Sequence, residues 1–272
     1  MSVKFSICNE LFEGWSFERV IGYISKIGYS GLEIAPFTIS NDIRRVSKDQ
    51  RRKIREVAEQ YGVSIVGTHW LLVTPPGLHI THPDESTRER TLDYLIALIK
   101  FTAEIGGKIM VFGSPKQRNI LPGINRDKAW SWAINVFREA CRVAEDYGVI
   151  ICMEPLSRDQ TNFINTAEEA VLLIEKVGSP NFRLILDVRS MFDEGLPHDK
   201  LIRNYGKYLE HFHANDDNGL GPGFGRANYY KIAKALSDIN YRGYVSVEVF
   251  DFSLGAKYIA ERSIVNLIRY FG

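Results

Sequence analysis

VIICME, residues 149–154, is a run of apolar residues that ends in a glutamate. An amphipathic pattern over 129–146 and a glycine at 148 precede it, which is typical of a helix that ends just before a strand. The same order of helical pattern, glycine and apolar run recurs along the chain. We therefore expect strands in eight runs: VKFSIC (3–8), GLEIA (31–35), SIVGTH (64–69), KIMVF (108–112), VIICME (149–154), RLILD (183–187), YLEHFHA (208–214) and YVSVEV (244–249).

Helical patterns fill the intervals between these runs. Besides 129–146, apolar residues recur at helical spacing over 17–27, 87–105 and 167–177. Ser86 is expected to cap the helix over 87–105, and Thr166 the helix over 167–177, where Glu169 completes the spacing of a capping box. Glycines between helix and strand are suited to helix C-caps; they are Gly28, Gly62, Gly106, Gly148, Gly178 and Gly243.

Alternation of strand and helix predicts an α/β protein with a parallel sheet. Eight such units within 272 residues match a (β/α)₈ TIM barrel, in one domain over 1–272, because no linker or composition break divides the chain. A doubly wound open sheet is the alternative. It would usually carry a glycine-rich loop after the first strand, and CNELFEGW (8–15) has none.

The composition excludes several classes of function. Apolar residues make up 45% of the chain and the net charge is +1, so nothing favours a nucleic acid or a membrane surface as partner. Cys8, Cys141 and Cys152 form no CxxC spacing and fit reduced thiols in a cytoplasmic protein. We find no secretory signal, and no run reaches the roughly 18 apolar residues that a membrane span needs.

Four ionisable residues end four successive runs in the second half of the chain: Glu154, Asp187, His213 and Glu248. An ionisable group at the end of a buried strand is costly unless something compensates it. Any one of them alone would more often be a salt-bridge partner or a loop cap. In a barrel, however, the C-terminal ends of the strands converge on one pocket, so we expect the four side chains to share a site.

A divalent metal ion would compensate these charges. Three carboxylates so close together repel one another, and some would be forced to protonate. With one imidazole they form an oxygen-rich donor set, which favours Mn²⁺, Mg²⁺ or Co²⁺ over a sulfur-rich zinc site, while Zn²⁺ stays open. We expect one divalent ion per chain, with Mn²⁺ as the first choice.

Several segments around these residues carry a resemblance. They are the GxEIxP pattern from Gly31, MEPL (153–156), TNFINT (161–166), LDVRSM (186–191), HFHANDDN (211–218) and VEVF (247–250). Over essentially the whole chain the sequence resembles the xylose-isomerase-like barrels, and within them the sugar and sugar-phosphate isomerases and epimerases of the ketose 3-epimerase type. The resemblance implies that the four residues above bind the metal, that the two glutamates act as the acid–base pair, and that the chain forms a homo-oligomer.

The reaction expected of such a site is proton transfer through an enediolate. One glutamate removes the proton from the carbon next to a sugar carbonyl, and the metal stabilises the negative charge that results. Return of a proton to the same carbon from the opposite face is epimerisation. Return to the former carbonyl carbon is aldose–ketose isomerisation. The expected partner is therefore a small sugar or sugar phosphate.

Three positions depart from the family pattern. Ser190 stands where sugar epimerases usually have a histidine, Gly219 where an arginine is common, and Gln160 where a further glutamate is expected. These departures concern substrate contacts more than metal ligands. They leave metal binding expected and put the particular sugar in doubt.

Further side chains are expected to meet the substrate: His69, Trp70, Lys116, Arg118, Gln160, Arg189, Ser190 and Arg226. The basic ones would suit an anionic or phosphorylated sugar, although Lys116 and Arg118 also fit a solvated loop. GLGPGFGR (219–226) lacks the GK[ST] ending of a phosphate-binding loop and is interpreted as a mobile loop over the pocket. Glu33 and His211 are expected to lie beside the site.

Three other functions remain as alternatives. A sugar or cyclitol dehydratase on the same scaffold would share the metal and the proton abstraction. A DNA-repair endonuclease of the endonuclease IV type would need more histidines than this chain has, and Gly113 and Ser190 stand where further ligands would be expected. A non-catalytic sugar-binding barrel would have no reason to retain both glutamates beside Asp187 and His213.

Overall fold

The computed structural model describes residues 3–272 and contains a closed barrel of eight parallel strands. Each strand pairs with its neighbours in sequence, and β1 pairs with β8 to close the barrel. The predicted (β/α)₈ fold is confirmed, and all eight predicted runs contain a strand. The strands are β1 (Lys4–Cys8), β2 (Gly31–Ile34), β3 (Ser64–Thr68), β4 (Ile109–Phe112), β5 (Ile150–Met153), β6 (Phe182–Asp187), β7 (Leu209–Ala214) and β8 (Tyr244–Val247).

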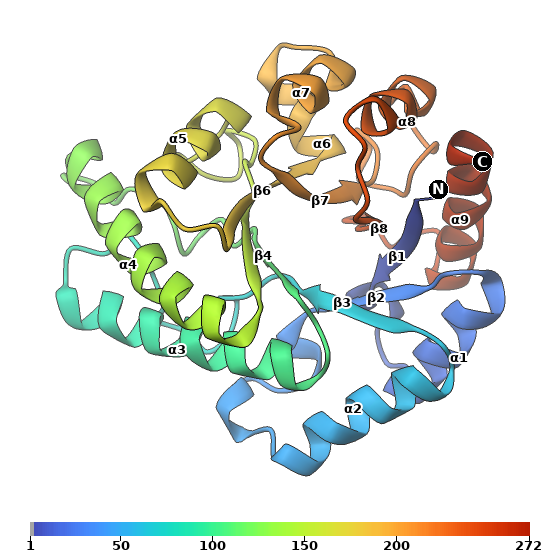
Figure 1. Ribbon diagram of the computed structural model, residues 1–272, viewed down its shortest axis with the longest axis horizontal. Coiled ribbons are helices and arrows are strands. Elements are labelled where there is room, and N and C mark those ends of the chain that lie inside the picture. The colour runs from blue at the N-terminus through green and yellow to red at the C-terminus, as the bar shows by residue number, and fades with distance from the viewer. Residues whose placement is uncertain (1–2) are drawn as a thin grey trace.

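Helices form a ring around the barrel (Figure 1). The α-helices are α1 (Phe17–Ile27), α2 (Lys48–Gln60), α3 (Glu85–Glu104), α4 (Arg126–Tyr147), α5 (Ala167–Val177), α6 (Val188–Met191), α7 (His198–Tyr205), α8 (Tyr229–Asp238) and α9 (Ala256–Phe271). Short 3₁₀ turns are η1 (Asn9–Phe12), η2 (Pro36–Thr38), η3 (Ile43–Arg45) and η4 (Phe192–Glu194). Within the described residues no helix is long and apolar enough to cross a membrane.

The helix ends mostly follow the sequence signals. Gly28, Gly148 and Gly178 are left-handed C-caps of α1, α4 and α5, a conformation that costs glycine little. The prediction that Ser86 caps α3 is wrong. Asp84 is the cap, because its carboxylate accepts from the Ser86 amide at 3.2 Å and carries the negative charge that a helix N-terminus favours.

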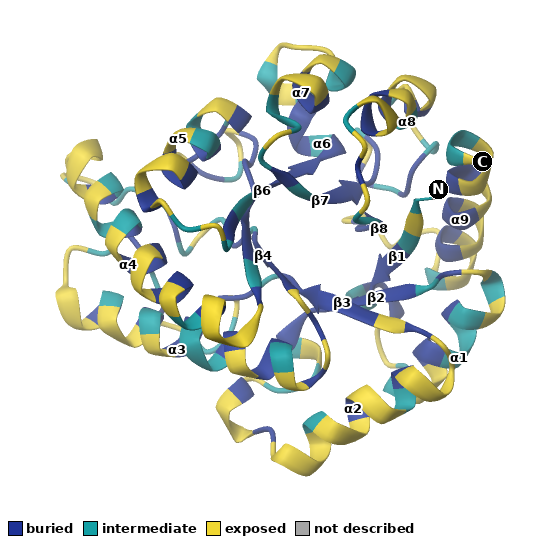
Figure 2. Ribbon diagram, viewed as in Figure 1, coloured by how far each residue is buried: buried dark blue, intermediate teal, exposed yellow. Residues whose placement is uncertain are grey.

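The barrel interior has an apolar half and a polar half. Val66, Val111, Cys152 and Ile185, from β3 to β6, belong to a small interior cluster, separate from the main core between strands and helices. Figure 2 shows that main core as the buried inner face of the helix ring. On the other strands the interior positions are buried and, apart from Cys8, polar; they are Ser6, Cys8, Glu33, His211, His213 and Ser246. The three cysteines are free and buried.

Candidate active site

Glu154, Asp187, His213 and Glu248 come together at the C-terminal ends of β5 to β8. Side chains alternate along a strand, so residues two apart share a face. Cys152 and Ile185 fill the barrel interior, and Glu154 and Asp187, each two residues on, therefore point to its axis. All four side chains are buried, and each offers one ligand atom within 4.8 Å of the others. We call these four residues the quartet.

The carboxylates of the quartet disturb one another. Burial and the neighbouring Glu248 raise the pKa of Glu154 well above its ordinary value. Burial and Glu248 likewise raise the pKa of Asp187, to about 6. Burial acts in the same direction on Glu248, but the His213 imidazole outweighs it and lowers the pKa of Glu248. A cation among these oxygens would relieve the repulsion.

One ring nitrogen of His213 is paired with a buried carboxylate, and the other makes no hydrogen bond with the described residues. Its Nε2 lies 3.2 Å from Oε2 of Glu33, which is fully buried and also lies 2.9 Å from Nε2 of His211. Its Nδ1 is 2.9 Å from Oε2 of Glu248, but is not aligned for a hydrogen bond and has no such partner among the described residues. A buried imidazole nitrogen that faces carboxylates without a hydrogen bond is what a metal ligand requires, so the quartet fits a divalent ion.

Asp187 is fixed by two neighbours on the following loops. Its Oδ1 accepts from the Ser190 amide at 2.8 Å, and its Oδ2 accepts from Nδ2 of Asn215 at 2.5 Å. Asn215 Oδ1 in turn accepts from the Arg189 amide at 2.8 Å. Ser190 thus lies beside the quartet as expected, but acts there through its backbone. Asn215 was not predicted, and its only sequence signal is its place two residues after His213.

Arg118 lies behind the site rather than in it. The side chain is fully buried and donates to the backbone carbonyls of Glu154 at 2.7 Å, Phe112 at 3.2 Å and Ser114 at 3.3 Å. Each of its three guanidinium nitrogens donates to a backbone carbonyl, and the side chain is fully buried, so it is not exposed to a substrate phosphate. Lys116 is exposed on the same loop. The prediction that Arg118 contacts the substrate is therefore corrected: it ties the ends of β4 and β5 together.

A small cavity of about 10 Å³ lies above the quartet, against two of its members, Glu154 and Glu248. Its walls include His69, Trp70 and Gln160, three of the expected substrate contacts; the remaining lining residues are Val111, Gly113, Glu154, Leu156, Glu248 and Phe250. Gly113 is essential to this shape, because a Cβ built there would lie 1.9 Å from Oε2 of Glu154. The Arg189 guanidinium lies 5.1 Å from the centre of the Phe250 ring, against this wall.

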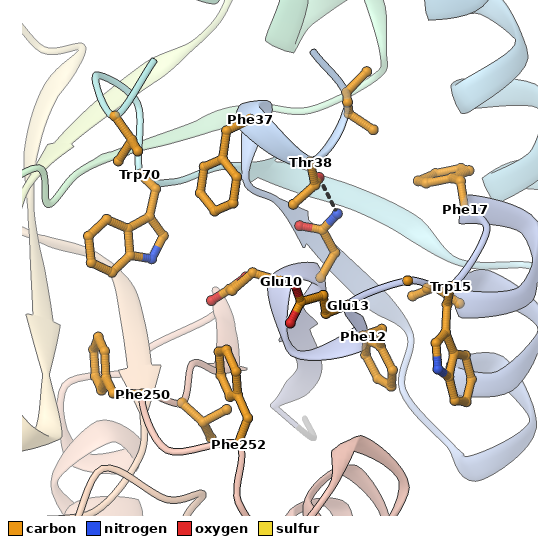
Figure 3. A pocket seen from close by; sticks show the side chains of 16 residues that line it. Glu10, Phe12, Glu13, Trp15, Phe17, Phe37, Thr38, Trp70, Phe250 and Phe252 are labelled. Atoms are coloured by element: carbon orange, nitrogen blue, oxygen red, sulfur yellow. Dashed lines mark hydrogen bonds between the residues drawn. The ribbon is translucent and has the colours of Figure 1, made fainter. Parts of the chain in front are cut away.

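A larger cavity of about 700 Å³ adjoins the small one and shares Trp70 and Phe250 with it (Figure 3). Its other walls come from the segment after β1 and from η2, with aromatic side chains on most sides. Glu10 is part of this wall, and its Oε2 lies 2.8 Å from Nε2 of His69. Sequence analysis missed Glu10, which lies in η1, two residues after the interior residue Cys8 that ends β1.

Arg226 is not brought to the site. Its guanidinium pairs with Asp217 at 2.7 Å, is mostly exposed, and borders a separate surface hollow near α7 and α8. The glycine-rich segment 219–226 lines neither of the two cavities. Its backbone is tied to Asp216, which accepts from the amides of Gly223 and Ala227. The expectation of a mobile loop over the pocket is therefore not supported.

Comparison with known proteins agrees with this geometry. Residues 21–270 match the family described as Xylose isomerase-like TIM barrel. The chain is 30% identical over 247 residues to D-psicose 3-epimerase of Agrobacterium fabrum, covering 87% of this chain and 81% of that protein. It is 29% identical over 241 residues to D-psicose 3-epimerase of Ruminiclostridium cellulolyticum, covering 86% and 78%.

The fold has matching solved structures. D-psicose 3-epimerase with D-tagatose, from Clostridium cellulolyticum H10, superposes with a TM-score of 0.83 at 24% identity, and the match covers 98% of this chain and 99% of that one. The predicted resemblance to ketose 3-epimerases is confirmed by these relatives, which are isomerase-class enzymes. The chain belongs to the xylose isomerase-like TIM barrel family, and it is an isomerase.

Proposed function

We propose that this protein is a divalent-metal-dependent epimerase or isomerase of a ketose, with Glu154 and Glu248 exchanging protons with the substrate as its acid–base pair. One observation carries the proposal: two buried glutamates with oppositely shifted pKa values offer ligand atoms within 4.8 Å of those of His213 and Asp187. When bound by the quartet, a divalent ion would supply Lewis acidity toward the substrate oxygens. Mn²⁺ is our first choice for this ion, because the donors are mostly carboxylates.

The directions of the two pKa shifts support one distribution of roles between the glutamates. Glu248, whose pKa is lowered, is the base that takes the proton from the carbon next to the sugar carbonyl. The C–H electrons then form the carbon–carbon double bond of an enediolate, with the negative charge on the former carbonyl oxygen. Glu154, whose pKa is raised, returns a proton to the same carbon from the opposite face. In the reverse direction the two roles exchange.

Other residues of the site keep this geometry. Asn215 and the Ser190 amide hold Asp187, and Arg118 holds the backbone of Glu154. His69, Trp70 and Gln160 are proposed to orient the sugar, since they line the cavity above the quartet. A positioned acid or base contributes about 10²- to 10⁴-fold in rate, so removal of either glutamate should abolish turnover in a folded protein.

The test is incubation with D-fructose, D-psicose and D-tagatose in D₂O with Mn²⁺ or Co²⁺, followed by NMR of the products. We expect deuterium at the carbon next to the carbonyl, with a new epimer or aldose, and no exchange with Glu154→Gln or Glu248→Gln. Loss of a hydroxyl from the product would instead establish the dehydratase. If the protein binds metal but no deuterium enters any ketose, the non-catalytic sugar-binding barrel becomes the better interpretation.

The endonuclease alternative has no support at the site. A further metal ligand at position 113 would need a side chain, and its Cβ would collide with Glu154 where that carboxylate now stands. Ser190 meets Asp187 through its amide. We also propose, from the family resemblance of the sequence alone, that the chain assembles into a homo-oligomer.

A further inference from the structure

The larger cavity beside the quartet has acidic groups and aromatic walls. Figure 3 shows the carboxylates of Glu10 and Glu13 among the rings of Trp70, Phe37 and Phe250. These two glutamates are the charged side chains among its described lining residues, and no lysine, arginine or histidine lines it. Three basic side chains lie against its outer walls, with Arg19 and Lys257 near Trp15 and Arg189 near Phe250.

Glu10 has one oxygen that is not satisfied. Its side chain is only 10% exposed, and Oε2 is engaged by His69 at 2.8 Å. Oε1 is buried and has no hydrogen-bond partner among the described residues. A buried carboxylate oxygen left without a donor costs free energy, so a native protein normally satisfies it. The polar neighbour Asn9 makes its contacts elsewhere: its Nδ2 donates to Thr38, and its Oδ1 accepts from the Ala35 amide.

Glu10 lines the larger cavity, so a ligand there can supply the missing donor once the carboxylate turns its buried Oε1 toward it. A sugar hydroxyl would satisfy Glu10 alone. An ammonium group would satisfy Glu10, be attracted by the Glu13 carboxylate, and lie against aromatic faces whose negative charge density favours cations. An anionic group such as a phosphate would meet two carboxylates and no lining cation.

We propose that this cavity receives a positively charged substituent of the substrate, an ammonium group on a short apolar linker, while the sugar part lies at the quartet. The proposal rests on the proposed function for the position of the sugar. Continuity of the two cavities supports it, because Trp70 and Phe250 line both. Glu10 also connects them through His69, which lines the small cavity. The substrate class is then an amine-bearing ketose rather than a ketose phosphate.

The probes are ketohexose derivatives that carry one linker with three alternative ends: ammonium, methyl or carboxylate. The linker is attached at C6 in one set and at C1 in a second. Dissociation constants are measured with Mn²⁺ present by quenching of tryptophan fluorescence, since Trp15 and Trp70 line the cavity. In at least one set we expect the ammonium end to bind about tenfold more tightly than the methyl end, with the carboxylate end weakest.

Two variants test the residues. Glu13→Gln, at an exposed position, and Glu10→Gln, which keeps the hydrogen bond to His69, should each reduce the preference for ammonium severalfold. Glu18→Gln, which removes the same charge outside the cavity, should retain it. Equal binding of the three ends, a preference for carboxylate, or a preference that survives both variants would overturn the proposal.

The outcome separates the subsite from the reaction. If unsubstituted ketoses are turned over but the ammonium end is not preferred, the proposed subsite is wrong and the proposed function stands. If the ammonium derivatives bind selectively, this selectivity is lost in both variants, and no proton exchange at carbon is seen, the proposed subsite stands and the proposed reaction is wrong.

Discussion

Glu33 Oε2 lies 3.2 Å from Nε2 of His213, on the side of the ring away from the open Nδ1. Burial would raise the pKa of Glu33, but the facing rings of His211 and His213 lower it well below its ordinary value. In the proposed metal site, Glu33 would orient His213 and make Nδ1 a better ligand.

We expect Glu33→Gln to weaken Mn²⁺ binding by about 10- to 100-fold, because the glutamine keeps the shape but not the charge. Calorimetric titration of the metal-free protein measures the effect. Glu89→Gln, on the exposed face of α3, is the control and should bind as wild type does. An unchanged affinity in Glu33→Gln would show that Glu33 serves only to satisfy the buried histidines.

Arg118 and Lys116 make a matched pair two residues apart. Arg118→Met would remove the arginine donor from the carbonyls of Phe112, Ser114 and Glu154, of which Phe112 would keep the Glu154 amide. We expect it to lower the free energy of unfolding by about 3 kcal/mol. Lys116→Met, at an exposed position, should change it by less than about 0.5 kcal/mol.

Urea denaturation of both variants decides between a structural and a substrate-binding role for Arg118. If Arg118 contacted the substrate, its loss would raise KM and leave stability unchanged. The structural role predicts instead that stability falls whether or not substrate is present.

Gly113 gives a test of how closely Glu154 must be positioned. A methyl group at this position would lie 1.9 Å from Oε2 of Glu154, so in Gly113→Ala the carboxylate has to move. Because a misplacement of about 1 Å can cost about 100-fold in rate, we expect a loss of kcat of that order. Gly22→Ala in α1 is the control, since its added methyl meets only the Tyr61 ring, at 3.2 Å.

The measurement is kcat together with the thermal midpoint of unfolding for both variants. Wild-type kcat in Gly113→Ala would mean that Glu154 tolerates displacement and is not the proton donor.

The barrel and the quartet can be predicted from the sequence because both follow from patterns of residues that repeat over a few positions. Alternation along β5 and β6 puts Glu154 and Asp187 on the interior face, and barrel closure brings the strand ends together. Glu33 and His211 follow from the same alternation on β2 and β7. No long-range information is needed for any of these residues, beyond the closure of the barrel.

The basic side chains and the cap of α3 could not be predicted in this way. Arg118 follows β4 in a loop, where a buried arginine and a solvated one have the same local pattern, and its three carbonyl partners come from two strand ends. Arg226 is held by Asp217, a partner nine residues earlier. Asp84 and Ser86 are both good caps, and the choice depends on how the preceding loop enters the helix.

Glu194 predicts a pH dependence of stability outside the quartet. Burial raises its pKa from 4.5 to about 7, although its Oε2 accepts from the Ala167 amide at 2.9 Å. The folded state therefore prefers the protonated form. Ionisation of Glu194 therefore lowers the free energy of unfolding. This loss is absent below the pKa of the unfolded state, near 4.5, grows as the pH rises, and is complete above about 7. Glu194→Gln removes the charge and keeps an acceptor for the amide.

We expect Glu194→Gln to match wild type near pH 4.5 and to be more stable by about 1 to 3 kcal/mol at pH 8. This range is set below the free energy that the full pKa shift would give, because the side chain is only partly buried. Urea denaturation at pH 5, 6, 7 and 8 measures the gap. Glu168→Gln removes an exposed charge from the same end of α5 and controls for net charge. A gap that is constant with pH, or that shrinks as the pH rises, would mean that Glu194 is ionised in the folded protein at no cost, as a carboxylate stabilised by the N-terminus of α5 would be.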